Sequence, residues 1–339
     1  MGIIKLLDCT LRDGGYINDW NFGESNIKET IKNLVKSRMD IIELGFLKDE
    51  PYQKDRTVFN STDQLSALIR PKKPNTDYAA MIEVINPIAL EMLAPRNDET
   101  VDIIRVIVWK QLLQKGFDYC KGIVEKGYRL CVQPARVDQY SYDDFVNMID
   151  LFKQLNPLAI YVVDSFGTQD KSALMEYINL ADNHLPADVA LGYHGHNNLM
   201  QAFGTAEALL ELNLNREIII DASVYGIGRG AGNLNTELIA LHLNARYNTH
   251  YEIEPMLEVY ENCLKHIFVK SSWGYSLPAF LTALYNCNPN YLNYYGQDLG
   301  LSATDIDGVL RTINEDDRII FTEEVADRYW TAYKESRGV

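Results

Sequence analysis

The sequence contains no apolar run that approaches the roughly 18 residues of a membrane-spanning helix, so we expect no membrane association. It also lacks a stripe of basic residues, because 32 Lys and Arg stand against 47 Asp and Glu, a net charge of −15. A polyphosphate partner normally meets a basic surface, and we therefore expect no nucleic acid partner. Proline is sparse as well, at 11 of 339 residues, and the composition excludes a disordered or collagen-like chain.

Cysteine is scarce. The five cysteines are scattered and form no CxxC pair, so we expect reduced thiols that pack as small hydrophobic residues in a cytoplasmic protein. The first residues, MGIIKLLDCTLRDGG, lack the apolar core and cleavage site of a signal peptide. Leu6 stands where N-myristoylation requires Ser or Thr.

Short apolar runs alternate with amphipathic stretches over the first 245 residues or so. The runs are rich in Ile, Val and Tyr and are too continuous for half-exposed strands, which predicts strands buried on both faces. In Asn26–Asp40 and Asp170–Ala181, the apolar residues follow helical spacing. The predicted strands are Ile3–Leu11, Ile41–Leu47, Tyr78–Glu83, Ile103–Val108, Arg129–Ala135, Ala159–Phe166, Ala190–His196 and Glu217–Ile227.

This rhythm predicts an α/β fold, a (β/α)8 TIM barrel, with a doubly wound open sheet as the alternative. Residues 250–339 contain no convincing strand and are dense in aromatic residues, which predicts a helical extension. We expect a catalytic barrel over residues 1–249 and a helical C-terminal segment over residues 250–339 packed on it.

Polar residues gather where the predicted strands end, the face that carries the active site in barrels of this kind. The clearest group is YHGHNN. His194 and His196 are two residues apart on a strand, so their side chains project to the same side and can share one metal ion. Asp13 from the first strand would add a carboxylate and leave open positions for substrate. The alternative is two histidines bonded to loop backbone.

The opening DCTLRDGG places Arg12 beside Asp13 at a Gly-Gly turn. A guanidinium there can bind a carboxylate or a developing oxyanion, although the same tripeptide also occurs in turns with a surface ion pair. Glu43 lies inside an apolar strand, where an ionised carboxylate needs a partner, and Arg12 is the candidate. A purely structural charge pair is the alternative.

The segment GIGRGAGN matches a loose dinucleotide fingerprint. A true fingerprint opens a βαβ unit, whereas here the predicted sheet is ending. We therefore interpret it as a flexible loop over the site, with Asn233 supplying a side-chain oxygen.

Together, DCTLRDGG, IIELGF, YHGHNN and GIGRGAGNLNTE resemble the metal-dependent TIM-barrel superfamily of carbon–carbon lyases and synthases. The resemblance covers residues 1–245 or so, and the overall length and the helical C-terminal part are most similar to 4-hydroxy-2-oxovalerate aldolase. It implies Asp13, His194 and His196 as metal ligands, Asn233 as a fourth, and Arg12 and Glu43 in the catalytic centre. The ion would be Mn²⁺ or Mg²⁺, with Co²⁺ or Zn²⁺ as further options.

The sequence departs from this pattern at Tyr16, where the aldolases carry a histidine base and the synthases a glutamine. Near a cation the pKa of a phenol could fall, so Tyr16 either replaces the base or walls the pocket. Arg229 stands where the synthases usually carry a glutamate, and the loop lacks the cysteine of the CoA lyase, which argues against thioester substrates. GYSLPAFL, around Tyr275, resembles the stretch that brings a tyrosine to the aldolase site; the alternative is an aromatic residue of the helical core.

These features favour a divalent-metal-dependent aldolase that acts on a 4-hydroxy-2-oxo acid. The enzyme would cleave this acid to pyruvate, or a related 2-oxo acid, and an aldehyde, or form it from them. Two alternatives stay open: a Claisen-type synthase using an acyl-CoA, and a non-catalytic barrel with a vestigial site. The resemblance leaves room for a homo-oligomer and for an aldehyde dehydrogenase partner, which the sequence does not decide.

Overall fold

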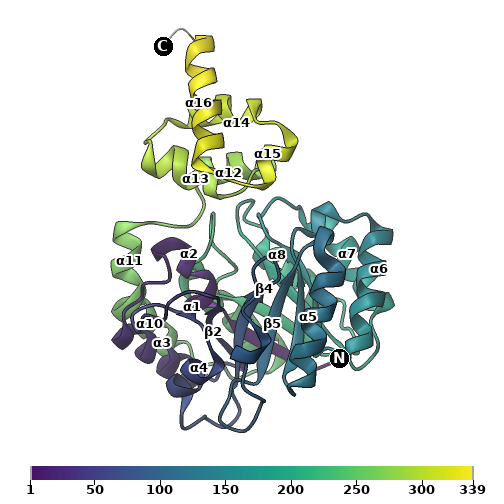
Figure 1. The fold of residues 1–339 in the computed structure, drawn as a ribbon. Coiled ribbons are helices and arrows are strands. Elements are labelled where there is room, and N and C mark those ends of the chain that lie inside the picture. Colours follow the sequence, from purple (N-terminus) through teal and green to yellow (C-terminus); the bar gives the residue numbers. More distant parts are fainter. Residues whose placement is uncertain (1, 338–339) are drawn as a thin grey trace.

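The computed structural model describes residues 2–337 and contains a closed barrel of parallel strands ringed by helices, with further helices above it (Figure 1). The first barrel strand, β1, pairs with both β2 and β9, and this closure excludes the open-sheet alternative. The strands are β1 (Ile4–Asp8), β2 (Ile41–Leu47), β3 (Val58–Phe59), β4 (Asp77–Glu83), β5 (Ile103–Val108), β6 (Arg129–Pro134), β7 (Ala159–Asp164), β8 (Ala190–Gly195) and β9 (Ile218–Ala222).

Helices follow the barrel strands and continue to the end of the described chain, and none of them is both long and apolar enough to cross a membrane. The helices of the barrel region are α1 (Thr10–Asp13), α2 (Gly15–Asn18), α3 (Glu24–Lys36), α4 (Thr62–Ile69), α5 (Leu113–Glu125), α6 (Tyr142–Phe152), α7 (Lys171–His184), α8 (Ala202–Glu211) and α9 (Thr236–Tyr247). Those beyond it are α10 (Glu254–Val259), α11 (Lys265–Lys270), α12 (Leu277–Leu284), α13 (Asn290–Leu292), α14 (Ala303–Thr312), α15 (Glu315–Ile319) and α16 (Glu323–Arg337). Short 3-10 or π turns are η1 (Leu90–Met92), η2 (Lys110–Leu112), η3 (Val137–Gln139), η4 (Lys153–Leu155), η5 (Val224–Gly226), η6 (Tyr260–Leu264) and η7 (Asn293–Asp298).

The apolar patterns of the sequence correspond to two cores. Side chains such as Leu7, Ile41 and Cys131 fill the barrel interior, and a larger cluster packs between the strands and the surrounding helices. In α3 the buried face includes Ile27 and Ile31, as the helical spacing predicts. All five cysteines are buried and free. Each fully buried aliphatic side chain contributes about 1.5–3 kcal/mol, so this double core holds the strand ends in fixed positions.

The eight predicted barrel strands are all present, and five of them end earlier than predicted, three by one or two residues and the first and last by more. The first stops at Asp8, because the Asp8 carboxylate accepts the backbone N–H of Thr10 (3.0 Å) and turns the chain into α1. The last stops at Ala222, and the Ser223 hydroxyl then donates to the carbonyl of Ile227 (2.7 Å), which closes the turn around η5.

The C-terminal helices divide between two environments. Helix α10 packs against α3, whereas α12 to α16 surround a small core of their own; we call residues 277–337 the C-terminal lobe. The lobe lies over the carboxyl ends of the strands in Figure 1. Three side chains of the barrel loops donate to it: Asn198 to the carbonyl of Ala279 (3.1 Å), Arg136 to Asn286 (3.1 Å) and Arg229 to Asn288 (2.6 Å). The domain boundary between residues 249 and 250 stays a prediction. Residues 1, 338 and 339, at the outer ends of the two predicted domains, lie outside the described residues.

Candidate active site

Three predicted metal ligands meet at the carboxyl end of the barrel. His194 and His196 point to the same side of β8, and Asp13 reaches them from α1. Their ligand atoms all lie within 4.8 Å of one another, and Nε2 of His196 is 3.8 Å from Oδ2 of Asp13. All three side chains are buried. The structure therefore brings together the residues that the sequence motifs singled out.

The other nitrogen of each imidazole is already engaged. Nδ1 of His194 is 3.0 Å from Oδ2 of Asp221, and Nδ1 of His196 is 3.0 Å from the backbone carbonyl of Arg229. Burial lowers the pKa of His196 to about 4, although Asp13 acts in the opposite direction. His196 is thus neutral at physiological pH, and both rings can present Nε2 to a metal, the arrangement common in protein metal sites.

The Asp13 carboxylate is ionised, as a metal ligand must be. Burial alone would raise its pKa, but Arg12 and the two histidines outweigh this effect and hold the pKa of Asp13 well below its usual range. Asn233 donates from Nδ2 to Asp13 (2.7 Å) and to the carbonyl of Ile227 (3.1 Å). Among residues 2–337, the buried Oδ1 of Asn233 has no hydrogen-bond partner, as a fourth ligand would require. This donor set fits a divalent cation.

Gly228 explains why the GIGRGAGN loop needs a glycine beside this cluster. A Cβ at Gly228 would lie 2.3 Å from Nδ2 of Asn233 and 2.6 Å from Oδ2 of Asp13. No other residue fits there without displacing the candidate ligands, so the loop belongs to the site.

Arg12 is fixed by carboxylates on two sides. Its Nε donates to Glu43 (2.7 Å), as expected from the sequence, and its Nη1 contacts Asp13. Although burial disfavours the charge, Asp13 and Glu43 raise the pKa of Arg12, and the guanidinium stays charged. Nη2 of Arg12 has no hydrogen-bond partner within residues 2–337, which leaves its N–H groups available to a ligand.

A buried charge network extends beyond the predicted residues. Arg105 on β5 lies between Glu43, at 2.9 Å, and Asp221 on β9, which in turn bonds His194. The network thus joins Arg12 to a candidate metal ligand through the barrel interior. Sequence reasoning missed Arg105 and Asp221, although both stand inside apolar strands, the signal that drew attention to Glu43.

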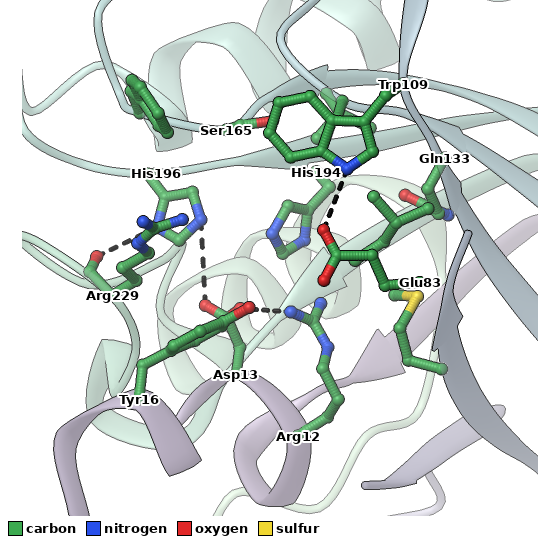
Figure 2. Close-up of a pocket in the computed structure, with 15 residues that line it drawn as sticks. Arg12, Asp13, Tyr16, Glu83, Trp109, Gln133, Ser165, His194, His196 and Arg229 are labelled. Atoms are coloured by element: carbon green, nitrogen blue, oxygen red, sulfur yellow. Dashed lines mark hydrogen bonds and ion pairs between the residues drawn. The ribbon is translucent and has the colours of Figure 1, made fainter. Parts of the chain in front are cut away.

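Fifteen residues line an open cavity of about 560 Å³ over the cluster (Figure 2). Within it, the Trp109 indole donates to Oε1 of Glu83 (2.9 Å). The guanidinium of Arg229 lies 5.3 Å from the ring centres of both Tyr16 and Phe166. The lining residues are Arg12, Asp13, Tyr16, Met81, Glu83, Ile107, Trp109, Gln133, Ala135, Val163, Ser165, Phe166, His194, His196 and Arg229.

Two predicted tyrosines differ in their placement. Tyr16 lines the cavity, where burial raises its pKa to about 12 even though Arg229 and Arg12 act to lower it, and a lower pKa beside a bound cation stays a prediction. The phenol stays protonated at neutral pH. Tyr275 does not line the cavity, and its side chain is 54% exposed just before α12. Its catalytic role stays a prediction that this placement does not support.

Comparison with known proteins places the chain among lyases. Residues 97–262 match the family described as HMGL-like. A 4-hydroxy-2-oxovalerate aldolase of Bacillus cereus (strain ATCC 10987 / NRS 248) is 24% identical over 263 residues, which are 76% of this chain and 75% of that protein. An oxaloacetate decarboxylase of Mycobacterium tuberculosis (strain ATCC 25618 / H37Rv) is 24% identical over 259 residues, 71% of this chain and 70% of that protein.

Solved structures show the same fold. The N-terminal domain of a candidate aldolase from Bacteroides vulgatus superposes with a TM-score of 0.73 at 21% identity, over 87% of this chain and 98% of that one. Hydroxymethylglutaryl-CoA lyase from Pseudomonas aeruginosa gives a TM-score of 0.62 at 16% identity, over 80% of this chain and 94% of that one. The resemblance seen in the sequence is confirmed, and the protein is an enzyme, a carbon–carbon lyase built on a (β/α)8 barrel, in which residues 97–262 match the HMGL-like family.

Proposed function

We propose that the protein is a divalent-metal-dependent aldolase that cleaves a 4-hydroxy-2-oxo acid to pyruvate, or a related 2-oxo acid, and an aldehyde, or catalyses the reverse condensation. The cluster of Asp13, His194 and His196 beside the Arg12 guanidinium, at the base of one cavity, is the observation that carries this proposal. The aldolase names of several relatives support it.

Asp13, His194 and His196 would hold the ion, and Asn233 would offer the fourth ligand. Mn²⁺ or Mg²⁺ suits this mixed nitrogen and oxygen set, as do Co²⁺ and Zn²⁺. When bound, the metal would act as a Lewis acid that polarises the 2-oxo group of the substrate.

Arg12 would donate to the 2-oxo oxygen as it gains negative charge during cleavage. Its two carboxylate contacts hold the guanidinium in place before the reaction, and such fixed donors typically contribute about 10²–10³ in rate. Glu43 and Arg105 would act through Arg12 as positioning residues.

The charges of the site suit a monoanionic substrate. The three buried carboxylates of Asp13, Glu43 and Asp221 exceed the two guanidiniums of Arg12 and Arg105 by one negative charge. A divalent ion would convert this balance to one positive charge, which favours binding of a 2-oxo acid and formation of its enolate.

Arg229 would bind the substrate carboxylate. Its Nη2 donates to the neutral amides of Asn288 (2.6 Å) and Asn290 (3.4 Å), and within residues 2–337 no carboxylate lies within 4.0 Å of its guanidinium. Its buried Nε has no partner in the same part of the chain. A cation that faces the cavity without a counter-charge favours an anionic ligand. Tyr16 would form the wall beneath it and donate its phenolic proton to a substrate oxygen.

Decarboxylation of a β-oxo acid is a second candidate, favoured by the relative named oxaloacetate decarboxylase. Loss of carbon dioxide from oxaloacetate leaves the same pyruvate enolate, which Arg12 would stabilise in the same way. The two reactions differ in one respect, because only the aldol cleavage requires removal of a proton from a C4 hydroxyl.

The test is pyruvate release from a series of 4-hydroxy-2-oxo acids, followed with lactate dehydrogenase and NADH. We expect release that depends on added Mn²⁺ or Mg²⁺ and that falls by at least 10² in Arg12→Ala while bound metal is retained. If no member of the series yields pyruvate in the presence of metal, the aldolase proposal is wrong.

A further inference from the structure

Glu83 is a carboxylate of the cavity that forms no ion pair among residues 2–337. It ends β4, is partly buried, and lines the same cavity as Arg12 and the histidines. Its Oε1 accepts the indole N–H of Trp109 at 2.9 Å, and across residues 2–337 no Lys, Arg or His lies within 4.0 Å of the carboxylate. One oxygen is thus held by a neutral donor, and the other has no protein hydrogen-bond partner in that range.

The other side chains of the cavity that could accept a proton are unsuited to act as the base. Asp13, His194 and His196 are the candidate metal ligands. Tyr16 occupies the position of the histidine base in the aldolases, but burial raises its pKa to about 12. Of the residues that line the cavity, Glu83 is left as the ionisable group free to exchange a proton.

The position of Glu83 suits the reacting end of the proposed substrate. Figure 2 shows its carboxylate directed into the cavity on the side of Arg12 and His194, whereas Tyr16 and Arg229 lie on the other side. A 4-hydroxy-2-oxo acid with its carboxylate toward Arg229 and its 2-oxo oxygen at Arg12 would extend its C4 hydroxyl toward Glu83.

We propose that Glu83 is the general base and acid of the aldol cleavage, a role that rests on the proposed function. The free oxygen of Glu83 takes the proton of the C4 hydroxyl, the C4–O bond becomes a carbonyl, and the C3–C4 bond breaks. The electron pair of the C3–C4 bond forms the enolate, which Arg12 stabilises, and the aldehyde leaves. The Glu83 carboxylic acid then returns the same proton to C3, which yields the 2-oxo acid and restores the carboxylate.

The test compares two reactions in Glu83→Gln. The amide keeps the hydrogen bond with Trp109 but cannot take up a proton, so release of pyruvate from the 4-hydroxy-2-oxo acid should fall by about 10²–10⁴ in kcat. Oxaloacetate decarboxylation needs no proton removal from a hydroxyl. It should stay within about threefold of the wild type after subtraction of the rate with metal alone, since Arg12 and the metal ligands are untouched.

Two further variants complete the experiment. Glu91→Gln, the same change at an exposed glutamate of η1, should leave both reactions unaltered. Trp109→Phe removes the indole N–H that donates to Glu83 and should lower aldol cleavage more than decarboxylation, because Trp109 acts as a positioning residue. Bound metal and the thermal unfolding midpoint of every variant are measured alongside, to show that each protein is folded and loaded.

The outcomes separate the two proposals. Loss of aldol cleavage with retained decarboxylation supports the role of Glu83. Cleavage that persists in Glu83→Gln, or an equal loss of both reactions, overturns that role and leaves the aldolase proposal standing. Failure of the wild-type enzyme to cleave any 4-hydroxy-2-oxo acid overturns the aldolase proposal, and the role of Glu83 with it.

Discussion

Replacement of Arg105 by methionine should destabilise the protein strongly. Arg105 is fully buried, lies 2.9 Å from Glu43, pairs with Asp221, and stacks 4.9 Å from the ring centre of Tyr161. Methionine fills a similar volume but removes the charge, so Glu43 keeps only Arg12 as a charged partner and Asp221 keeps only its contact with His194. Breaking one partner of a buried pair costs about 3–5 kcal/mol, and we expect the free energy of unfolding to fall by that amount.

The assay is urea-induced unfolding of the metal-free protein, followed by circular dichroism at constant pH. Arg129→Met is the matched control, because Arg129 pairs with Asp77 at 2.6 Å on the same sheet but both side chains are about one-third exposed. Exposed pairs contribute about 0.2–1 kcal/mol, so this variant should lose little stability.

A double mutant isolates the charge effect. Asp221→Asn in the Arg105→Met background removes the buried negative charge that Arg105 no longer neutralises and should recover part of the lost free energy. A cost below about 1 kcal/mol for Arg105→Met, or no recovery in the double mutant, would refute the view that this network is a tightly coupled buried charge system.

Three further predictions address the cavity. Asn288→Asp places a carboxylate against Arg229, so the KM for the 2-oxo acid should rise about tenfold or more with little change in kcat; an unchanged KM would remove Arg229 from substrate binding. Tyr16→Phe removes a protonated phenol and should raise KM modestly, whereas a kcat loss near 10³ would restore Tyr16 as the base. Because the pKa of His196 is lowered from 6.5 to about 4, its neutral form contributes stability that is present above pH 6.5 and is lost as the pH falls toward 4. The metal-free protein should lose this stability in urea titrations over that range, and His196→Gln should show a shallower loss.

Much of the site followed from the sequence because barrel strands put their carboxyl ends on one face. Once the HxH spacing on a strand and the Arg-Asp pair after the first strand are recognised, the barrel requires them to meet. The same reasoning predicts the pairing of Glu43 with Arg12, since a carboxylate in an apolar strand needs a counter-charge.

The missed residues fall into two groups. Arg105, Asp221 and Glu83 carried usable signals, because the first two interrupt apolar strands and the third ends a predicted strand. The contact of Asn288 with Arg229 carried none, since it depends on how the C-terminal lobe packs over the barrel. The position of Tyr275 also depends on how the C-terminal lobe packs over the barrel, so its local motif could not predict it.

The pKa of Tyr16 illustrates a further limit. Proximity to cations favours the phenolate, and the sequence placed Arg12 nearby, but burial against Trp20 and Phe46 has the larger effect. A local motif names the neighbours of a residue but not the depth at which it is buried.

The central claim is that Asp13, His194 and His196 bind the ion on which carbon–carbon cleavage depends. The most direct measurement is pyruvate release from a 4-hydroxy-2-oxo acid by chelator-treated enzyme, before and after titration with Mn²⁺, with calorimetric binding of Mn²⁺ recorded on the same protein. We predict no release without the ion, recovery at one ion per chain, and loss of both binding and release in a variant that combines His194→Gln and His196→Gln. Release that persists after removal of all metal, or Mn²⁺ binding unchanged in the double variant, would contradict the account.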